Sequence, residues 1–260
     1  MPIITLTTDL GLKDYYVASL KGNILSQLAD VNIVDITHNV NPYDAPKAAF
    51  IVKQCYKTFP KDTIHIIGLN AELDENTVHL AIYYDGHYFI GADNGMFSLI
   101  FEAIPDKIVE LNIAQDTDNK TFPTKDIFVK AACHIARGGT LEMIGKIKEE
   151  LNKSIPFQAT SENNYIKGMI TYVDHYGNLL TNVSESLFKS FGRGRNFTIY
   201  LRGGSYKVSK ITPTYNRISA GNILAMFSST GFIEIAVSKG HASKLLGLKE
   251  TDLIRIEFYD

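Results

Sequence analysis

Cysteine and tryptophan are almost missing from this 260-residue chain, which has two cysteines, Cys55 and Cys133, and no tryptophan. Two cysteines cannot form a disulfide network, and because they are not part of a CxxC pair they offer no ordinary zinc site. The lack of tryptophan excludes nothing. Chains without disulfides are typical of reducing compartments, so we expect a cytoplasmic protein.

A surplus of one charge is also missing, because 26 basic residues stand against 28 acidic ones and leave a net charge of −2. This balance does not predict a broad basic surface for nucleic acid. No stretch approaches the roughly 18 consecutive apolar residues of a membrane span, and the N-terminus lacks the segments of a signal peptide. We therefore expect a soluble protein with a small-molecule ligand or a protein partner, and neither nucleic acid nor membrane.

Common catalytic and metal-binding motifs are not found either. The chain has no GxSxG elbow, no P-loop and no GxGxxG fingerprint, which disfavours the usual hydrolase, nucleotidase and dinucleotide-binding classes. Seven histidines are present, but none lies in an HExxH pattern or another spacing typical of metal ligands. We expect no metal.

The first half of the chain does contain a clear alternation of strands and helices. Short β-branched runs predict strands, and apolar residues at steps of three and four predict helices between them. This alternation is typical of an α/β domain with a mainly parallel sheet and Rossmann-like layers. Asp85-Gly86, between two apolar runs, predicts one antiparallel hairpin. The expected strands are residues 3–7, 33–36, 63–69, 78–84, 88–90 and 108–113, and the expected helices are residues 17–28, 45–55, 96–103 and 125–137.

The second half has a different pattern. The polar residues 154–164 interrupt the alternation, and short apolar runs separated by Gly, Asn and Ser turns follow them. They predict a smaller all-β, barrel-like C-terminal domain. We place the α/β domain at residues 1–155 and the β-barrel at residues 165–260. The expected strands of the barrel are residues 166–173, 197–201, 206–210, 223–227, 232–237 and 253–258.

Four places carry side chains suited to a ligand. Asp9 follows the first strand, where ligands of open α/β sheets bind, although it could equally cap the loop or the next helix. Residues 174–178 (Asp-His-Tyr-Gly-Asn) combine an acid, an aromatic ring and an amide, but such a run is more often a turn. Residues 228–231 (Ser-Ser-Thr-Gly) could hold a carboxylate or form a plain loop. Thr124 precedes a helix, where it could cap the helix or face an anion.

Five segments, taken in order, carry a resemblance to a known family. They are residues 7–11 (TTDLG), 35–38 (DITH) with 41–43 (NPY), 93–95 (DNG), 174–182 (DHYGNLLTN) and 229–240 (STGFIEIAVSKG). Together they resemble the S-adenosylmethionine (SAM) hydroxide adenosyltransferases and their fluorinase and chlorinase relatives, over nearly the whole chain. The resemblance implies an α/β domain followed by a β-barrel, no cofactor besides SAM itself, and a homotrimer with sites between the N-terminal domain of one subunit and the C-terminal domain of its neighbour.

The resemblance also implies which residues bind the substrate. Asp9 would bind the two ribose hydroxyls, and Tyr43 would line the sugar and the sulfonium. Asp174 and Ser229 would hold the ammonium and the carboxylate of the methionine part. The residues expected to enclose and read the adenine are Tyr176, Asn178 and Tyr215.

The chain departs from the family where the nucleophile would bind. Hydrolytic members carry an Asp-Arg-His triad that orients water, whereas this chain has Asn70 in place of the Asp, no Arg after it, and Pro123 in place of the His. An amide is no base and proline has no polar side chain, so the triad is missing unless an acid of residues 72–75 or Lys125 replaces it. We take Asn70 and Thr124 as the candidates for orienting the nucleophile.

Fluorinases lack this triad too and have a serine at the position of Thr124. They carry an arginine where this chain has Thr230, and a bulky aromatic residue where it has Leu180, so halogenation is the less favoured alternative. The leading hypothesis is hydrolysis of SAM to adenosine and L-methionine by attack of water or hydroxide on C5′, which depends on positioning and desolvation of the nucleophile. The alternatives of another class are a protein that binds SAM or adenosine without turnover, and one that binds a different nucleoside.

Overall fold

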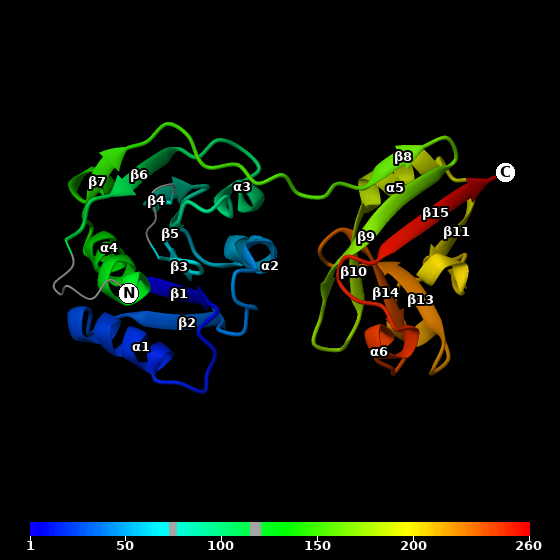
Figure 1. The fold of residues 1–260 in the computed structure, drawn as a ribbon, viewed down its shortest axis with the longest axis horizontal. Coiled ribbons are helices and arrows are strands. Elements are labelled where there is room, and N and C mark those ends of the chain that lie inside the picture. Colours follow the sequence, from blue (N-terminus) through cyan, green and yellow to red (C-terminus); the bar gives the residue numbers. More distant parts are fainter. Residues whose placement is uncertain (73–76, 115–120) are drawn as a thin grey trace. The chain divides into compact units, whose positions relative to one another are not determined.

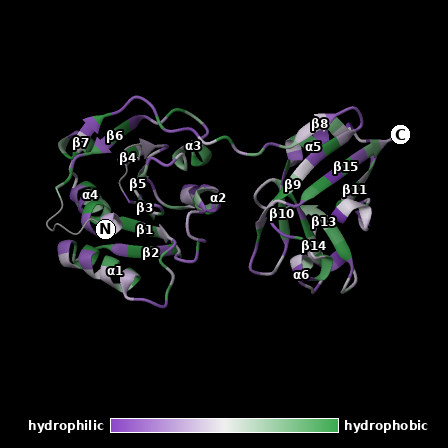
Figure 2. Ribbon diagram, viewed as in Figure 1, coloured by the Kyte–Doolittle hydropathy of each residue, from purple (hydrophilic) through white to green (hydrophobic). Residues whose placement is uncertain are grey.

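The computed structural model describes residues 1–72, 77–114 and 121–260, and it divides into two compact units, Met1–Pro156 and Phe157–Asp260 (Figure 1). Each unit has its own sheet and its own buried core. Hydrophobic residues are concentrated along the strands of both sheets (Figure 2). Within the described ranges, no helix is long and apolar enough to cross a membrane.

The first unit follows the predicted alternation of strands and helices. The buried face of its first helix consists of Val17, Leu20 and Ile24, in agreement with the apolar spacing in the sequence. The helices are α1 (Tyr16–Gln27), α2 (Ala45–Cys55), α3 (Phe97–Ile100) and α4 (Val129–Ala136). The strands are β1 (Ile3–Thr8), β2 (Asn32–Thr37), β3 (Ile64–Gly68), β4 (His79–Tyr84), β5 (His87–Ala92), β6 (Lys107–Leu111) and β7 (Gly145–Ile147).

The sheet of the first unit is mixed, which corrects the prediction of a mainly parallel sheet. Its strand order is β2-β1-β3-β5-β4-β6-β7; the first four strands are parallel, and β4, β6 and β7 each pair antiparallel with the strand before them in this order. The predicted hairpin explains the change from parallel to antiparallel pairing. Asp85 and Gly86 both have positive φ, 49° and 76°, as a tight two-residue turn requires, and the turn sends β5 back antiparallel to β4.

Helices cover both faces of this sheet. Successive strand residues point to opposite faces, so neighbouring residues of β3 enter different cores. Ile66 belongs to the cluster that contains Leu20 of α1, and α1 packs beside α4. Ile67 belongs to the cluster that contains Val52 of α2, and α2 packs beside α3. Both faces are therefore buried, and the loops at the strand ends are left to carry polar residues.

The second unit is built on an antiparallel sheet with the order β12-β11-β15-β9-β10-β14-β13, with β8 paired to β9. Ile211, just after β12, bridges to Ala225 of β13, so the two ends of the sheet approach each other and the sheet is nearly barrel-like. The two helices of this unit are α5 (Glu185–Gly192) and α6 (Ala242–Leu246). The strands are β8 (Thr160–Glu162), β9 (Tyr165–Val173), β10 (Leu179–Ser184), β11 (Asn196–Leu201), β12 (Tyr206–Val208), β13 (Ile223–Phe227), β14 (Phe232–Val237) and β15 (Leu253–Tyr259).

Candidate functional site

The carboxyl ends of two parallel strands bring predicted residues of the first unit to one edge of its sheet. Thr8, the last residue of β1, lies opposite Gly68, the last residue of β3. Asp9 comes directly after β1 and Asn70 is the second residue after β3, on the side where open α/β sheets bind ligands. The structure therefore brings Asp9 and Asn70 to the same end of adjacent strands.

Asp9 is half-buried beside the backbone of Tyr43. Burial raises the pKa of the Asp9 carboxyl, and the backbone N–H groups of Asp9 and Tyr43 lower it by a smaller amount. The Tyr43 ring is 78% exposed, and its backbone has a positive φ of 65°. The two predicted ligand residues are thus adjacent, with the tyrosine ring free to contact a ligand.

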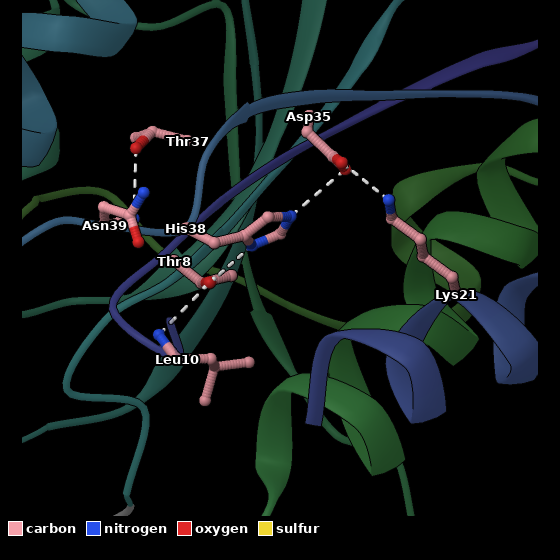
Figure 3. Close-up of polar contacts among 7 residues, drawn as sticks. All are labelled: Thr8, Leu10, Lys21, Asp35, Thr37, His38 and Asn39. Carbon is pink, nitrogen blue, oxygen red and sulfur yellow. Dashed lines mark hydrogen bonds and ion pairs between the residues drawn. The ribbon is translucent and has the colours of Figure 1, made fainter. Parts of the chain in front are cut away.

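A chain of polar contacts supports the loop that carries Asp9 (Figure 3). The Thr8 hydroxyl lies 2.7 Å from His38 Nδ1, and Lys21 of α1 donates to Asp35 Oδ2 at 2.6 Å. His38 Nε2 lies 3.1 Å from Asp35 Oδ1, an ion-pair contact without the directed geometry of a full hydrogen bond. Burial raises the pKa of Asp35, but Lys21 and His38 outweigh it, so the pKa is lowered overall.

Two of these contacts involve the Thr8 hydroxyl. The backbone N–H of Leu10 donates to it at 3.3 Å, and it also contacts His38 Nδ1. The other ring nitrogen of His38, Nε2, faces the Asp35 carboxylate. The DITH segment therefore supports the end of β1 instead of presenting an acid or a base to a ligand.

Thr124 packs directly on the end of β3. It is 3% exposed, and a Cβ added to Gly68 would lie only 2.8 Å from the Thr124 hydroxyl oxygen and 2.5 Å from its methyl carbon. Thr124 does not cap the helix from outside, as one interpretation of the sequence had it. It is the first residue of a π-helical turn, Thr124–Phe128, that leads into α4, with Pro123 at the cap position. The absence of a side chain at Gly68 is what allows Thr124 to lie this close to the strand.

The side chains that could replace the missing triad differ in exposure and in their contacts. Asn70 is exposed, with a left-handed φ of 49° that asparagine tolerates better than most residues. Lys125 lies 3.3 Å from Asp126 and is therefore engaged in an ion pair. Glu72 is exposed, whereas residues 73–76, which contain Asp74 and Glu75, lie outside the described part of the chain.

In the second unit, the turn between β9 and β10 holds two predicted ligand residues together. Both carboxylate oxygens of Asp174 accept hydrogen bonds from Asn178, one from its backbone N–H at 2.8 Å and one from its side chain at 3.0 Å. Gly177 has a positive φ of 81° and lies against the ring of His241, where no side chain would fit. Tyr176 is 75% exposed at the tip of this turn. The segment is a turn, as its composition indicated, and it presents an acid and an aromatic ring.

Tyr215 joins this cluster through a residue that the sequence analysis missed. Its hydroxyl donates to Glu234 Oε1 at 2.6 Å, and the charge of Asp174 acts on both residues. Ser229 is not part of the cluster: it is exposed in the turn between β13 and β14, at the opposite end of β14 from the Asp174 turn. A signal for Glu234 was available, because a single acid in the apolar run of residues 232–237 is unusual for a buried strand.

A surface groove of about 670 Å³ lies elsewhere in the second unit and contains none of the predicted ligand residues. Two of its cations are already engaged, because Arg255 pairs with Glu257 at 2.6 Å and stacks over Tyr165, and Lys207 lies over the Tyr200 ring. No group of three or more possible metal ligands occurs among the residues that the structure describes. The polar loops at the ends of β1, β3 and β9 are therefore the better candidates for a ligand site.

An α/β unit with polar residues after its parallel strands, followed by a nearly barrel-like unit, defines a two-domain protein. The chain belongs to the SAM hydroxide adenosyltransferase family, because the model of the N-terminal domain matches residues 4–145 and that of the C-terminal domain matches residues 168–255.

Named relatives and a solved structure resemble the chain along its whole length. A protein named (R)-S-adenosyl-L-methionine hydrolase from Methanocaldococcus jannaschii is 27% identical, over 98% of this chain and 96% of its own length. A fluorinase from Actinopolyspora mzabensis is 24% identical, over 98% and 97%. The crystal structure of an uncharacterized conserved protein from Thermotoga maritima superposes with a TM-score of 0.89 at 27% identity, covering 98% of this chain and 99% of that one.

Proposed function

We propose that this protein hydrolyses SAM to adenosine and L-methionine by attack of water or hydroxide on the ribose C5′. Membership of the family supports this proposal, as do relatives named SAM hydrolase over nearly the whole chain. The single observation that carries it is the half-buried Asp9 at the end of β1, beside the exposed Tyr43, where a ribose diol can be bound by a carboxylate.

The proposed ligand contacts come from both units. In the first unit, Asp9 binds the ribose hydroxyls and Tyr43 lines the sugar and the sulfonium. In the second unit, Asp174 holds the ammonium of the methionine part. Ser229 keeps the assignment to the carboxylate that the resemblance implies, although the register of β10 and β14 places it at the other end of β14. Tyr176, Asn178 and Tyr215 enclose the adenine. We also propose a homotrimer in which each site combines the first unit of one subunit with the second unit of another, and a cytoplasmic location, for which the two free cysteines are the support.

The chemical step in this proposal needs positioning more than acid or base catalysis. A sulfonium is a good leaving group, so the protein must hold a nucleophile in line with the C5′–S bond and exclude other water. Thr124, fixed against Gly68, and Asn70, two residues further along, are the side chains proposed to do this. As Cys55 and Cys133 have pKa values raised to about 11 by burial, we assign neither thiol a role as nucleophile.

One specific observation favours a second candidate function. Asn70 and Pro123 stand where hydrolytic relatives carry an acid and a histidine, and Lys125 is engaged by Asp126. A protein without a base could bind SAM or adenosine and release it unchanged. Halide transfer is a weaker third candidate, supported by the fluorinase relatives.

The deciding experiment is to incubate the purified protein with SAM, with and without chloride, and to separate the products by chromatography against a blank without protein. Adenosine and methionine above the blank are the expected products. A 5′-halogenated nucleoside would identify a halogenase instead. Intact SAM recovered with the protein after long incubation between pH 6 and pH 10 would contradict hydrolysis and support the binding protein.

A further inference from the structure

Glu234 is a buried acid in the middle of an apolar strand. It lies in β14, is 4% exposed, and is paired across the sheet with Leu180 of β10 and Met226 of β13. A carboxylate in such surroundings is costly unless hydrogen bonds or an opposite charge compensate it. The contacts around Glu234 therefore show what compensates the burial of its carboxylate.

Those contacts contain a hydrogen bond but no opposite charge. The Tyr215 hydroxyl donates to Glu234 Oε1 at 2.6 Å. Burial raises the pKa of Glu234, the bond from Tyr215 lowers it, and the negative charge of Asp174 raises it again. Every residue of the second unit is described, and within this unit no ion pair reaches Glu234 or Asp174. Two acids thus act on each other without a cation between them.

Glu234 lies on the strand between two turns that carry predicted ligand residues. Ser229 lies beyond one end of β14, and the Asp174 turn lies beside the other end, because Leu179 is paired with Ile235. Glu234 is in the strand between them. Its hydrogen bond to Tyr215 joins it to a residue predicted to enclose the adenine.

We propose that Glu234 is a specificity-determining residue which, together with Asp174, makes this site select a positively charged nucleoside over a neutral one. The inference rests on the proposed function and extends it to the choice of ligand. At neutral pH SAM carries an ammonium, a sulfonium and a carboxylate, a net charge of +1, and either cation can interact favourably with the two acids. Adenosine carries no charge and cannot, so it gains only the contacts of its base and ribose.

The test compares the affinity for SAM, measured by rapid filtration before turnover, with the affinity for adenosine, measured by calorimetry, in the wild-type protein and in Glu234→Gln, which keeps the shape and an acceptor for Tyr215. We expect SAM to bind about tenfold more weakly, equivalent to ~1.4 kcal/mol, while the affinity for adenosine changes by less than about twofold. Glu234→Asp, which retains the charge, should keep most of the preference for SAM. The matched control is Glu257→Gln, an acid of the same unit that pairs with Arg255.

A second variant covers the possibility that Glu234→Gln does not fold. Met226→Lys places a cation opposite Glu234 across the strand pair and should weaken SAM binding while adenosine binding is retained. If Glu234→Gln lowers the affinities for SAM and adenosine equally, and Tyr215→Phe lowers them by the same amounts, Glu234 only positions Tyr215. No change for either ligand would also overturn the inference, and in both cases hydrolysis would stand. A wild-type protein that does not bind SAM would overturn the proposed function, and this inference with it.

Discussion

At the scale of single residues, Asp9 has a raised pKa in the free protein because burial removes water from its carboxylate. A folded pKa above the ordinary 3.8 means that the ionised form opposes folding: stability is highest below that value and declines as the pH rises through the folded pKa. At neutral pH the charge of Asp9 therefore does not add to the stability of the fold.

Asp9→Ala should separate these two effects. A carboxylate that accepts two ribose hydroxyls contributes about 1.5 to 3 kcal/mol per charge-assisted bond, so adenosine affinity should fall at least about tenfold. The free energy of unfolding at pH 7 should not fall. Calorimetry with adenosine and urea unfolding measure both quantities, with Asp14→Ala as an exposed control. Unchanged affinity with lower stability would mean that Asp9 caps the loop.

Thr124→Val tests the positioning of the nucleophile. The substitution keeps the shape that packs on Gly68 and removes only the hydroxyl. The rate constant for adenosine formation should fall about tenfold, the loss of one hydrogen bond of ~1.4 kcal/mol in the transition state, while KM changes little. Thr63→Val is the matched control, because Thr63 is equally buried just before the start of β3. A rate equal to that of the wild type would remove Thr124 from the proposed mechanism.

The positions of some site residues could be predicted from the sequence, and the contacts of others could not. The place of Asp9 after a parallel strand follows from periodicity, since β-branched runs identify the strand and its end. The link between Tyr215 and Glu234 did not follow, because it joins residues 19 positions apart through the pairing of β14. The separation of Ser229 from Asp174 also depends on strand register, which the composition of a single strand does not contain.

At the scale of secondary-structure elements, a polar cluster crosses three parallel strands of the first unit. Thr5 of β1 lies 2.7 Å from His65 Nδ1, and His65 Nε2 lies 3.4 Å from His87 Nδ1 of β5. Burial lowers the pKa of His65 to about 3, and the pKa of His87 is also lowered, mainly by burial. Both histidines are thus neutral in the folded protein at physiological pH.

This cluster predicts acid sensitivity of the first unit. Because the folded pKa of His65 is below its unfolded value of 6.5, its contribution to stability is complete above about pH 6.5 and is lost as the pH falls toward about 3. The urea midpoint should therefore fall progressively from pH 7 to pH 4. His65→Gln should be less stable at pH 7 but have a shallower pH dependence, whereas exposed His175→Gln should resemble the wild type. Parallel curves for His65→Gln and the wild type would contradict the assignment.

The contacts among α1, β1 and β2 predict unequal effects of two substitutions. His38→Ala removes the buried partner of the Thr8 hydroxyl and should cost about 1 to 3 kcal/mol of unfolding free energy. Lys21→Ala removes a partly exposed ion pair with Asp35 and should cost less than about 1 kcal/mol. Urea unfolding at pH 7 compares them. Equal costs would show that the surface pair, and not the buried contact, supports the end of β1.

Elements were predictable where a local pattern determines them. Asp85-Gly86 identified its hairpin because two consecutive positive φ angles require such residues. The mixed sheet was not predictable, because periodicity identifies strands but not their directions, and β6 pairs with β4 rather than continuing the parallel order. The start of the helix at Thr124 was misjudged by one position, since the π-helical turn after Pro123 has no distinct sequence pattern.

At the scale of the whole molecule, the proposed trimer can be tested by mixing two inactive variants. Asp9→Ala damages the first unit and Asp174→Ala damages the second. If each site combines units from two subunits, mixed trimers contain some sites in which both units are intact, so co-expression should restore a fraction of the activity. Light scattering should give a mass about three times 29.0 kDa. A trimeric mixture with no more activity than either variant would place each site within one chain.

The first sheet has a parallel half and an antiparallel half, and two predicted site residues lie on the loops after the parallel strands. Asp9 and Asn70 follow its parallel strands, whereas β4, β6 and β7 form an antiparallel half that supports them from the side. If Asn70 and Asp9 have the roles proposed for them, substitutions in the loop after β3 can change how the nucleophile is held without altering the strand pairing beside Asp9. On this proposal, exchanging one nucleophile for another requires changes in this loop and in the segment around Thr124, and none in the paired strands.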